Sequence, residues 1–239
     1  MRGGFVSRVL GRSEARDCVK RPHSVVAIDG PAASGKSSTA QMVADKLGFL
    51  HVDSGSLYRA ATAAILRVDA DPSHWTEQAV LDAAGLIQLR AARTSFYPVI
   101  AGAAIEEEIR GLEVTRNVSR VAQMSRVRDW VNEKVRGAAE SSDVVVDGRD
   151  MGTVVFPDAD LKIFLVADSR ERALRRLRQR GTPTSQQLLD DETIRIMERD
   201  ARDAKQTVPA HDAVTIDTTA LTQAEQVDQI VNLAKERVR

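Results

Sequence analysis

The segment GPAASGKS, residues 30–37, constrains the fold of this chain more than any other stretch. It has the spacing G-x-x-x-x-G-K-S, follows the apolar run SVVAID and opens an amphipathic stretch that is typical of a helix. Glycines between a strand and a helix let backbone N–H groups wrap an anion, and the helix N-terminus adds positive potential. The context therefore predicts a nucleotide-binding P-loop at the start of an α/β fold.

Two side chains of this loop have expected chemical roles. Lys36 should reach the β and γ phosphates of a nucleotide, and the Ser37 hydroxyl should bind Mg²⁺. A tight turn that contains lysine by chance is the alternative, but it would not need Gly35, Lys36 and Ser37 together. The residues expected to bind the nucleotide, which is ATP in the family that the chain resembles below, are Gly30, Pro31, Ala32, Ala33, Ser34, Gly35, Lys36, Ser37 and Ser38.

Further apolar runs indicate the rest of the sheet. They are FLHV at 49–52, DVVVD at 143–147, DLKIFLV at 160–166 and AVTID at 213–217. Runs of this kind are typical of parallel strands that helices cover on both faces. Thr222 with Glu225, and Asp168 with Glu171, have the spacing of helix N-terminal caps. The pattern predicts an α/β chain with a parallel sheet.

The long segments between these strands suggest an organisation in parts. We expect residues 1–22, arginine-rich but without the apolar core of a secretory signal, to be a disordered leader rather than a transit segment. Residues 61–142 read as a mostly helical insertion, SHWTEQAVLDAAGLIQLR included, although IQLR and FYPVIAG could form a hairpin that Pro98 interrupts. Residues 170–209 form an arginine-rich excursion. The core is then 23–60, 143–169 and 210–239.

Composition excludes several classes of function. The chain has 34 basic residues (lysine plus arginine) and 34 acidic residues (aspartate plus glutamate). With no net charge, it has no overall electrostatic field that would attract nucleic acid or membranes. No run of about eighteen apolar residues could span a bilayer. The single cysteine, Cys18, can form no internal disulfide and matches no metal-ligand spacing, which favours the cytoplasm. We expect a cytoplasmic monomer.

The segment DSGSLYR, residues 53–59, directly follows the second expected strand. The carboxyl edge of a parallel sheet presents ligand-binding groups. Ser54, Tyr58 and Arg59 bring a hydroxyl, a phenol and a guanidinium within about one helical turn, a set that can hold a second phosphate. The alternative is a capped helix with a solvent-exposed arginine. No N-K-x-D-like guanine-binding sequence occurs, which argues against a GTPase.

The segment VVVDGRD, residues 144–150, ends a third strand with two carboxylates around one guanidinium. Taken alone, it could be a surface turn closed by an ion pair. Beside a P-loop, Asp147 is where a carboxylate that supports the magnesium ion belongs. Arg149 and Asp150 would then face whatever DSGSLYR holds.

Two helical stretches carry clusters of arginine. In TIRIMERDARDA, Arg195, Arg199 and Arg202 share one helix face, which favours a facing phosphate unless Asp191 and Glu198 neutralise Arg195 and Arg202. In SRERALRRLRQR, a solvated charged face and a lid over ATP remain equal alternatives.

Together, IDGPAASGKSS, DSGSLYR, VDGRDMGTVVFPDADLKIFL and ERDARD resemble the bacterial cytidylate kinases, which phosphorylate CMP and dCMP, over about residues 24–236. The resemblance implies a P-loop kinase core with a parallel sheet, a CMP-binding insertion, an arginine-rich mobile lid, and transfer of the ATP γ-phosphoryl group with Mg²⁺ held by Ser37 and Asp147. It implies catalytic roles for Lys36, Arg149 and Arg199. The implied CMP-binding residues are Ser54, Arg59, Arg149 and Arg199 for the phosphate with Tyr58 nearby, Ser119, Arg128 and Asp150 for cytosine, and Asp203 for the sugar.

One departure from the family pattern follows ERDARD. The chain continues AKQTVPAHDAV and is shorter there, so Gln206 stands about where an arginine is expected, and Lys205 could substitute only without the forked geometry of a guanidinium. Two other readings therefore stay open. The chain could be a kinase for UMP or AMP, or a nucleotide-binding regulatory module with impaired catalysis.

Overall fold

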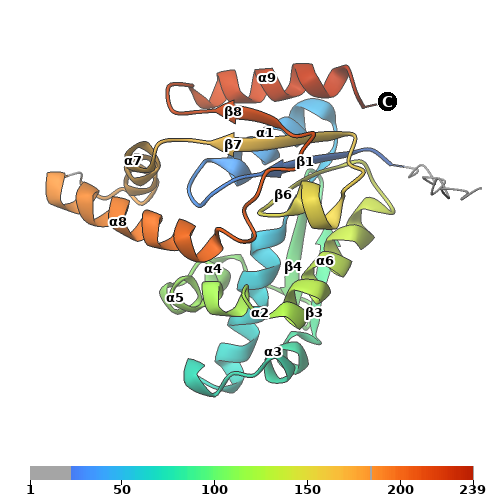
Figure 1. The fold of residues 1–239 in the computed structure, drawn as a ribbon. Helices are drawn as coiled ribbons and strands as arrows, with labels where there is room; N and C mark the ends of the chain where they lie inside the picture. Colours follow the sequence, from blue (N-terminus) through green and yellow to red (C-terminus); the bar gives the residue numbers. More distant parts are fainter. Residues whose placement is uncertain (1–22, 184, 239) are drawn as a thin grey trace, which may run out of the picture.

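The computed structural model describes residues 23–183 and 185–238 (Figure 1). The expected leader, residues 1–22, lies outside the described residues. The main sheet has five strands in the order β2-β6-β1-β7-β8, and every neighbouring pair is parallel. Its strands are β1 (Val25–Asp29), β2 (Leu50–Asp53), β6 (Val144–Gly148), β7 (Leu161–Val166) and β8 (Val214–Asp217). All five stretches expected to form this sheet are strands, so the predicted α/β core is confirmed.

Helices cover both faces of the sheet because alternate strand residues point to opposite sides. Val26 and Ile28 of β1 pack with α1 (Lys36–Leu47) and α9 (Gln223–Lys235). Val25 and Ala27 pack on the other face, in a hydrophobic cluster that continues into the helices of residues 54–139. The run of valines in β6 is fully buried because β6 is an interior strand, between β2 and β1, whose residues pack in the clusters on both faces.

The insertion, residues 61–142, combines helices with a small antiparallel sheet. It includes most of α2 (Ser54–Val68), a short 3₁₀ turn (Pro72–His74), α3 (Glu77–Ala84), β3 (Ile87–Ala91), β4 (Phe96–Ile100), β5 (Ala103–Ala104), α4 (Glu106–Ile109), α5 (Leu112–Val121) and α6 (Ser125–Ala139). The hairpin of IQLR with FYPVIAG is confirmed, so the helical reading of SHWTEQAVLDAAGLIQLR is wrong at its end. Pro98 pairs with Leu89 of β3, but β5 on the other side of β4 pairs only with Val99 and Ile100. Pro98 therefore lies at an edge of this small sheet, where a residue without a backbone N–H is tolerated.

The arginine-rich excursion, residues 170–209, contains most of α7 (Ser169–Gln179) and α8 (Gln186–Asp203). These helices pack together through Ala173, Leu177, Leu189 and Ile196, beside the carboxyl ends of the strands (Figure 1). The expected caps are present: Asp168 accepts from the backbone N–H groups that open α7, and Thr222 and Glu225 form a reciprocal capping box on α9. Within the described part of the chain, no helix has the length and apolar character needed to cross a membrane.

Candidate functional site

A cavity of about 580 Å³ opens at the carboxyl edge of the main sheet. Residues from the P-loop, the insertion and the excursion line it together. All the expected acceptor residues line this cavity: Ser54, Tyr58, Arg59, Ser119, Arg128, Arg149, Asp150, Arg199 and Asp203. The other expected residues that line it are Ala32, Ala33, Gly35, Lys36, Ser37, Ser38 and Asp147, whereas Gly30, Pro31 and Ser34 belong to the loop but not to the cavity wall.

The P-loop contains backbone conformations that most residues avoid. Gly30 has φ of 150°, and a Cβ there would lie 2.3 Å from the carbonyl oxygen of Leu165. No other residue type fits at that position without displacing β7. Ala33 also adopts a left-handed conformation, with φ of 58°. The sequence analysis assigned the tight wrapping to glycines, so it missed that an alanine carries part of the turn.

Lys36 points into the loop that precedes it. Its Nζ donates to the carbonyl oxygen of Pro31 at 2.7 Å, and only 6% of the residue is exposed. Burial, together with the positive charge of Arg149, holds the pKa of Lys36 well below its usual value. A phosphate beside Nζ would reverse this effect, because a neighbouring negative charge favours the ammonium form.

Ser37 and Asp147 converge on one point from different elements. Ser37 Oγ donates to Asp147 Oδ2 at 2.6 Å, and His51 Nε2 lies 2.7 Å from Oδ1. Burial raises the pKa of Asp147, but the hydrogen bonds from His51 and Ser37 and the nearby charges outweigh it and hold the pKa below its usual value. The carboxylate is therefore kept ionised. The sequence carries no local signal for this role of His51.

These two oxygens fit the needs of Mg²⁺, which prefers hard oxygen ligands and completes its shell with phosphate oxygens and water. Among residues 23–183 and 185–238, no group of three or more His, Cys, Asp or Glu side chains could hold a metal ion. A protein contribution of one hydroxyl and one carboxylate suits a metal that arrives with a nucleotide better than an all-protein metal cage.

The turn after β6 is held by a carboxylate from β1. Asp29 accepts from the backbone N–H groups of Met151 and Gly152 at 2.9 and 2.8 Å. The Met151–Val155 segment forms a wide π-helical turn that sequence reasoning did not find. Burial raises the pKa of Asp29 to about 6. This anchoring aims Arg149 and Asp150 into the cavity instead of leaving them as a surface ion pair.

The segment DSGSLYR is a capped helix whose functional side chains face inward. Asp53 accepts from Ser56 N at 3.2 Å and so starts α2, which carries Ser54, Tyr58 and Arg59 on its first two turns. Arg59 Nη1 donates to the Ile109 carbonyl oxygen and the Thr115 hydroxyl, so the reading of a solvent-exposed arginine is wrong.

Tyr58 contributes a buried phenol to the same wall. Its hydroxyl has no hydrogen-bond partner within the described chain, and burial raises its pKa to about 12. The hydroxyl is therefore protonated and able to donate, and the residue lines the cavity. The guanidinium of Arg128 lies over the ring at 5.9 Å from its centroid.

Two arginines from different elements share one carboxylate. Arg149 Nε lies 3.3 Å from Asp203 Oδ2, and Arg199 Nε lies 3.7 Å from the same oxygen. Within the described residues, Arg199 Nε has no hydrogen-bond partner. Burial and the charge of Arg149 lower the pKa of Arg199 to about 10. The Arg199 guanidinium therefore stays charged at neutral pH, and a bound anion would stabilise its buried charge.

The other arginines of α8 do not share this role. Arg195 is exposed and its Nη1 lies 3.4 Å from Glu192 Oε2, and Arg202 donates to the backbone oxygen of Glu198. Neither lines the cavity, so of the three arginines of the stripe only Arg199 lies where a phosphate could bind. The cavity also receives Arg110, Arg175 and Arg176, which sequence reasoning did not assign. Of the α7 arginines, Arg175 and Arg176 line the cavity, whereas Arg170 and Arg178 are exposed.

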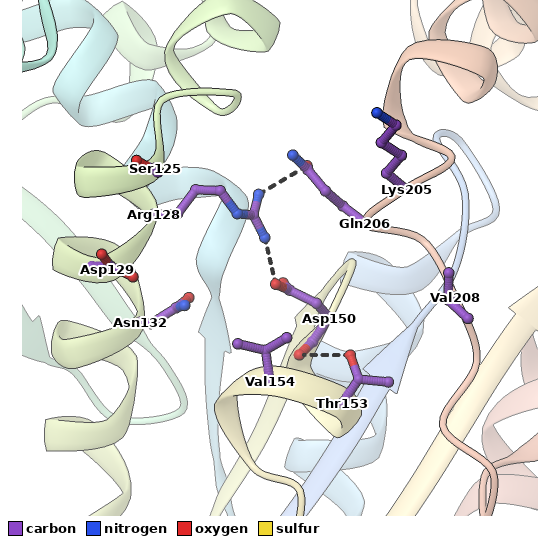
Figure 2. A pocket seen from close by; sticks show the side chains of 10 residues that line it. All are labelled: Ser125, Arg128, Asp129, Asn132, Asp150, Thr153, Val154, Lys205, Gln206 and Val208. Atoms are coloured by element: carbon purple, nitrogen blue, oxygen red, sulfur yellow. Dashed lines mark hydrogen bonds and ion pairs between the residues drawn. The ribbon is translucent and has the colours of Figure 1, made fainter.

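Arg128 spans from the insertion to the end of the excursion (Figure 2). It forms an ion pair with Asp150 through Nη2, and its Nη1 donates to Gln206 Oε1 at 2.9 Å. These three residues separate the main cavity from a second hollow of about 490 Å³. Lys205 lines the second hollow and not the main cavity. The idea that Lys205 replaces the expected arginine is therefore not supported by its position.

Comparisons with known proteins agree with this geometry. A family model described as Cytidylate kinase matches residues 26–236. A cytidylate kinase of Oceanobacillus iheyensis is 41% identical over 214 residues, covering 87% of this chain and 92% of the relative. One of Alkaliphilus oremlandii is 39% identical over 217 residues, covering 88% and 97%. A solved gluconokinase from Sinorhizobium meliloti 1021 covers 91% of this chain and 95% of that chain, but its TM-score of 0.46 and 16% identity add nothing to the assignment. The chain belongs to the cytidylate kinase family.

Proposed function

We propose that the chain transfers the γ-phosphoryl group of ATP to CMP or dCMP within the cavity at the sheet edge. The observation that carries the proposal is the shared cavity of the P-loop, with Lys36, and the arginines Arg59, Arg149 and Arg199. A phosphate-binding loop with its lysine and a set of three arginines, placed around one cavity, suit two phosphorylated substrates. Family membership supports CMP as the acceptor.

On the donor side, the P-loop binds the phosphates of ATP. Its backbone N–H groups and the N-terminus of α1 contact the anion, and Lys36 moves its ammonium from the Pro31 carbonyl to a phosphate oxygen. Ser37 and Asp147 would hold the Mg²⁺ that accompanies the nucleotide. When bound, Mg²⁺ neutralises charge on the phosphate oxygens and so favours nucleophilic approach.

On the acceptor side, Arg59, Arg149 and Arg199 bind the CMP phosphate with the hydroxyl of Ser54. Asp150 accepts from the cytosine amine, while Arg128 and Ser119 bind the N3 and O2 side, since an acid and an arginine complement that pattern of donor and acceptors. Asp203 accepts from a sugar hydroxyl. Support comes from the convergence of these side chains on one cavity.

The chemical step needs no general base from the protein, because the attacking oxygen of CMP is already ionised. Two polyanions must come into line, so Lys36, Arg149 and Arg199 offset their repulsion and stabilise charge on the loosely bound transferring group. Residues 61–142 act as the CMP-binding insertion and residues 170–209 as a lid. Closure of both excludes water, which would otherwise accept the phosphoryl group.

We also propose that the enzyme acts as a cytoplasmic monomer. A single cysteine, Cys18, agrees with a reducing compartment. All the proposed substrate-binding residues come from one chain, which supports the proposal of a monomer.

The test is a coupled assay of ADP release with CMP, dCMP, UMP, AMP and GMP at saturating ATP and magnesium. We expect the highest kcat/KM with CMP or dCMP. Preference for UMP or AMP would overturn the base assignment but keep the kinase. ADP release with none of the five, from protein that still binds ATP, would identify a regulatory module instead.

A further inference from the structure

His51 is a buried histidine in direct contact with the carboxylate expected to hold magnesium. Its exposed fraction is 7%, and its Nε2 lies 2.7 Å from Asp147 Oδ1. The other oxygen, Oδ2, accepts from Ser37 Oγ at 2.6 Å. Each oxygen of the carboxylate therefore has one protein partner, and the two partners lie on opposite sides of it.

The parallel register explains why this histidine reaches Asp147. β2 pairs with β6 so that His51 lies opposite Val145 and Asp53 opposite Asp147. Val145 packs in the cluster formed with α1, so Asp147, two residues later, points to the same face of the sheet. His51 points to that face as well, since it contacts Gln41 of α1. It is the diagonal neighbour of Asp147 on the face that carries the P-loop.

The second ring nitrogen is also held. His51 Nδ1 lies 3.1 Å from Gln41 Oε1. The Gln41 amide nitrogen in turn donates to Asp45 Oδ1 at 3.0 Å and to the Thr94 carbonyl oxygen at 3.3 Å. The imidazole is thus fixed at both nitrogens, and its orientation does not depend on a single contact.

We propose that His51 is a positioning residue that fixes the rotation of the Asp147 carboxylate, so that Oδ2 is presented beside Ser37 to the magnesium ion. The terminal torsion of an aspartate is broad and roughly two-fold, so an unrestrained carboxylate would spread over many orientations. Outer partners of ligating groups restrict this freedom and raise metal affinity. The inference rests on the proposed function, in which Ser37 and Asp147 hold Mg²⁺.

The experiment compares two polar substitutions of the same residue. His51→Gln places an amide nitrogen near the position of Nε2 and can still donate to Asp147. His51→Asn is one methylene shorter, places its amide near Nδ1 beside Gln41, and does not reach Asp147. Calorimetry gives the dissociation constant of a non-hydrolysable ATP analogue, once with saturating Mg²⁺ and once in EDTA. The ratio of the dissociation constant in EDTA to the dissociation constant with Mg²⁺ reports how much the metal contributes to nucleotide binding.

We expect the ratio to fall about tenfold in His51→Asn and by less than about threefold in His51→Gln, with binding in EDTA unchanged in both. Equal losses in the two variants, no loss in either, or equal loss with and without Mg²⁺ would each overturn the proposal. If His51→Asn fails to fold, His51→Phe, which keeps the ring but has no nitrogen to contact Asp147, is compared alone and in an Asp147→Asn background. Its effect on the ratio must disappear in the Asp147→Asn background, and an equal effect in both backgrounds overturns the idea. No acceptor is used, so a failure of CMP phosphorylation does not affect the result.

Discussion

Arg172 of α7 donates a hydrogen bond from Nη1 to the carbonyl oxygen of Ala32 in the P-loop, at 2.9 Å. Its Nη2 forms an ion pair with Asp200 of α8 at 2.7 Å, and its Nε donates to the Ala167 carbonyl oxygen. One buried guanidinium therefore joins both helices of the proposed lid to the loop that binds ATP. We therefore expect the position of the lid helices and the shape of the ATP-binding loop to depend on each other through this side chain.

Replacing Arg172 should weaken both the fold and ATP binding. Arg172→Met keeps the aliphatic bulk but leaves the Ala32 oxygen and Asp200 without their partner, at a cost of about 2 kcal/mol for charged hydrogen bonds. We expect the Tm to fall by roughly 5 °C and KM for ATP to rise, as measured by calorimetry and kinetics. Arg178→Met, on the exposed side of the same helix, is the control. Equal effects in the two variants would show that the coupling is absent.

The left-handed backbone of Ala33 predicts that a glycine at this position stabilises the fold. Its φ of 58° costs an L-residue about 1–2 kcal/mol, whereas glycine adopts this conformation freely and loses about 0.5–1 kcal/mol of unfolded-state entropy. Ala33→Gly should therefore raise the free energy of unfolding by about 0.5 kcal/mol in urea titrations without nucleotide. Ala101→Gly should act in the same direction, because Ala101 has φ of 50° in an exposed turn. Destabilisation in both would refute the strain argument.

Lys36→Met should abolish transfer without harming the fold. The ammonium is buried beside a carbonyl, so its removal relieves a desolvation cost and should leave Tm equal or higher. Turnover should fall on the order of a thousandfold, because the variant loses the ammonium charge that stabilises the negative charge of the phosphoryl group during transfer. Lys46→Met, at the other end of α1, controls for general effects. A Lys36→Met variant with a tenth of wild-type turnover would contradict the P-loop assignment.

Local patterns made most of the main sheet predictable. Short apolar runs marked all five strands, and side chains with cap spacing marked the starts of α7 and α9. The end of the Ser73–Arg90 stretch had two readings, because Ile87 continues the helical spacing of Val80 and Ala84, while IQLR could also pair with FYPVIAG. Pairing with β4 decided for the hairpin, and a short apolar run alone does not distinguish the two.

The candidate site was predictable where a residue type and its place on the sheet edge determined its role. Ser37 and Asp147 were expected together, and the structure brings them within a hydrogen bond. His51 was missed because a histidine within an apolar run gives no local signal, and only the register of β2 on β6 brings it to Asp147. The Arg172 link to the P-loop was hidden in the same way, by a basic helix whose buried side depends on tertiary packing.

Gln206 tests how the departure from the family pattern is accommodated. Its Oε1 accepts from Arg128 Nη1, which links the end of α8 to the insertion (Figure 2). Gln206→Ala removes a hydrogen bond to a charged group, so KM for CMP should rise by about tenfold while KM for ATP stays constant. Lys205→Ala should change neither constant by more than about twofold, because Lys205 lines only the second hollow. A larger effect of Lys205→Ala would reassign the role to that lysine.

Asp150 tests the choice of acceptor base. Its carboxylate pairs with Arg128 and lines the main cavity, and only 6% of the residue is exposed. If it accepts from the cytosine amine, Asp150→Ala should cost CMP roughly 1–3 kcal/mol in kcat/KM. UMP has a carbonyl in place of the amine and is repelled by the carboxylate, so its efficiency should fall less or rise.

The ratio of kcat/KM for CMP to that for UMP should therefore narrow by about tenfold or more in Asp150→Ala, at saturating ATP and magnesium. Asp129→Ala is a matched control, because Asp129 lies one residue after Arg128 but lines the second hollow. That variant should leave the ratio unchanged. Equal proportional losses for CMP and UMP in Asp150→Ala would show that the carboxylate serves only to hold Arg128 or the phosphate site, and the cytosine-reading role would have to be withdrawn.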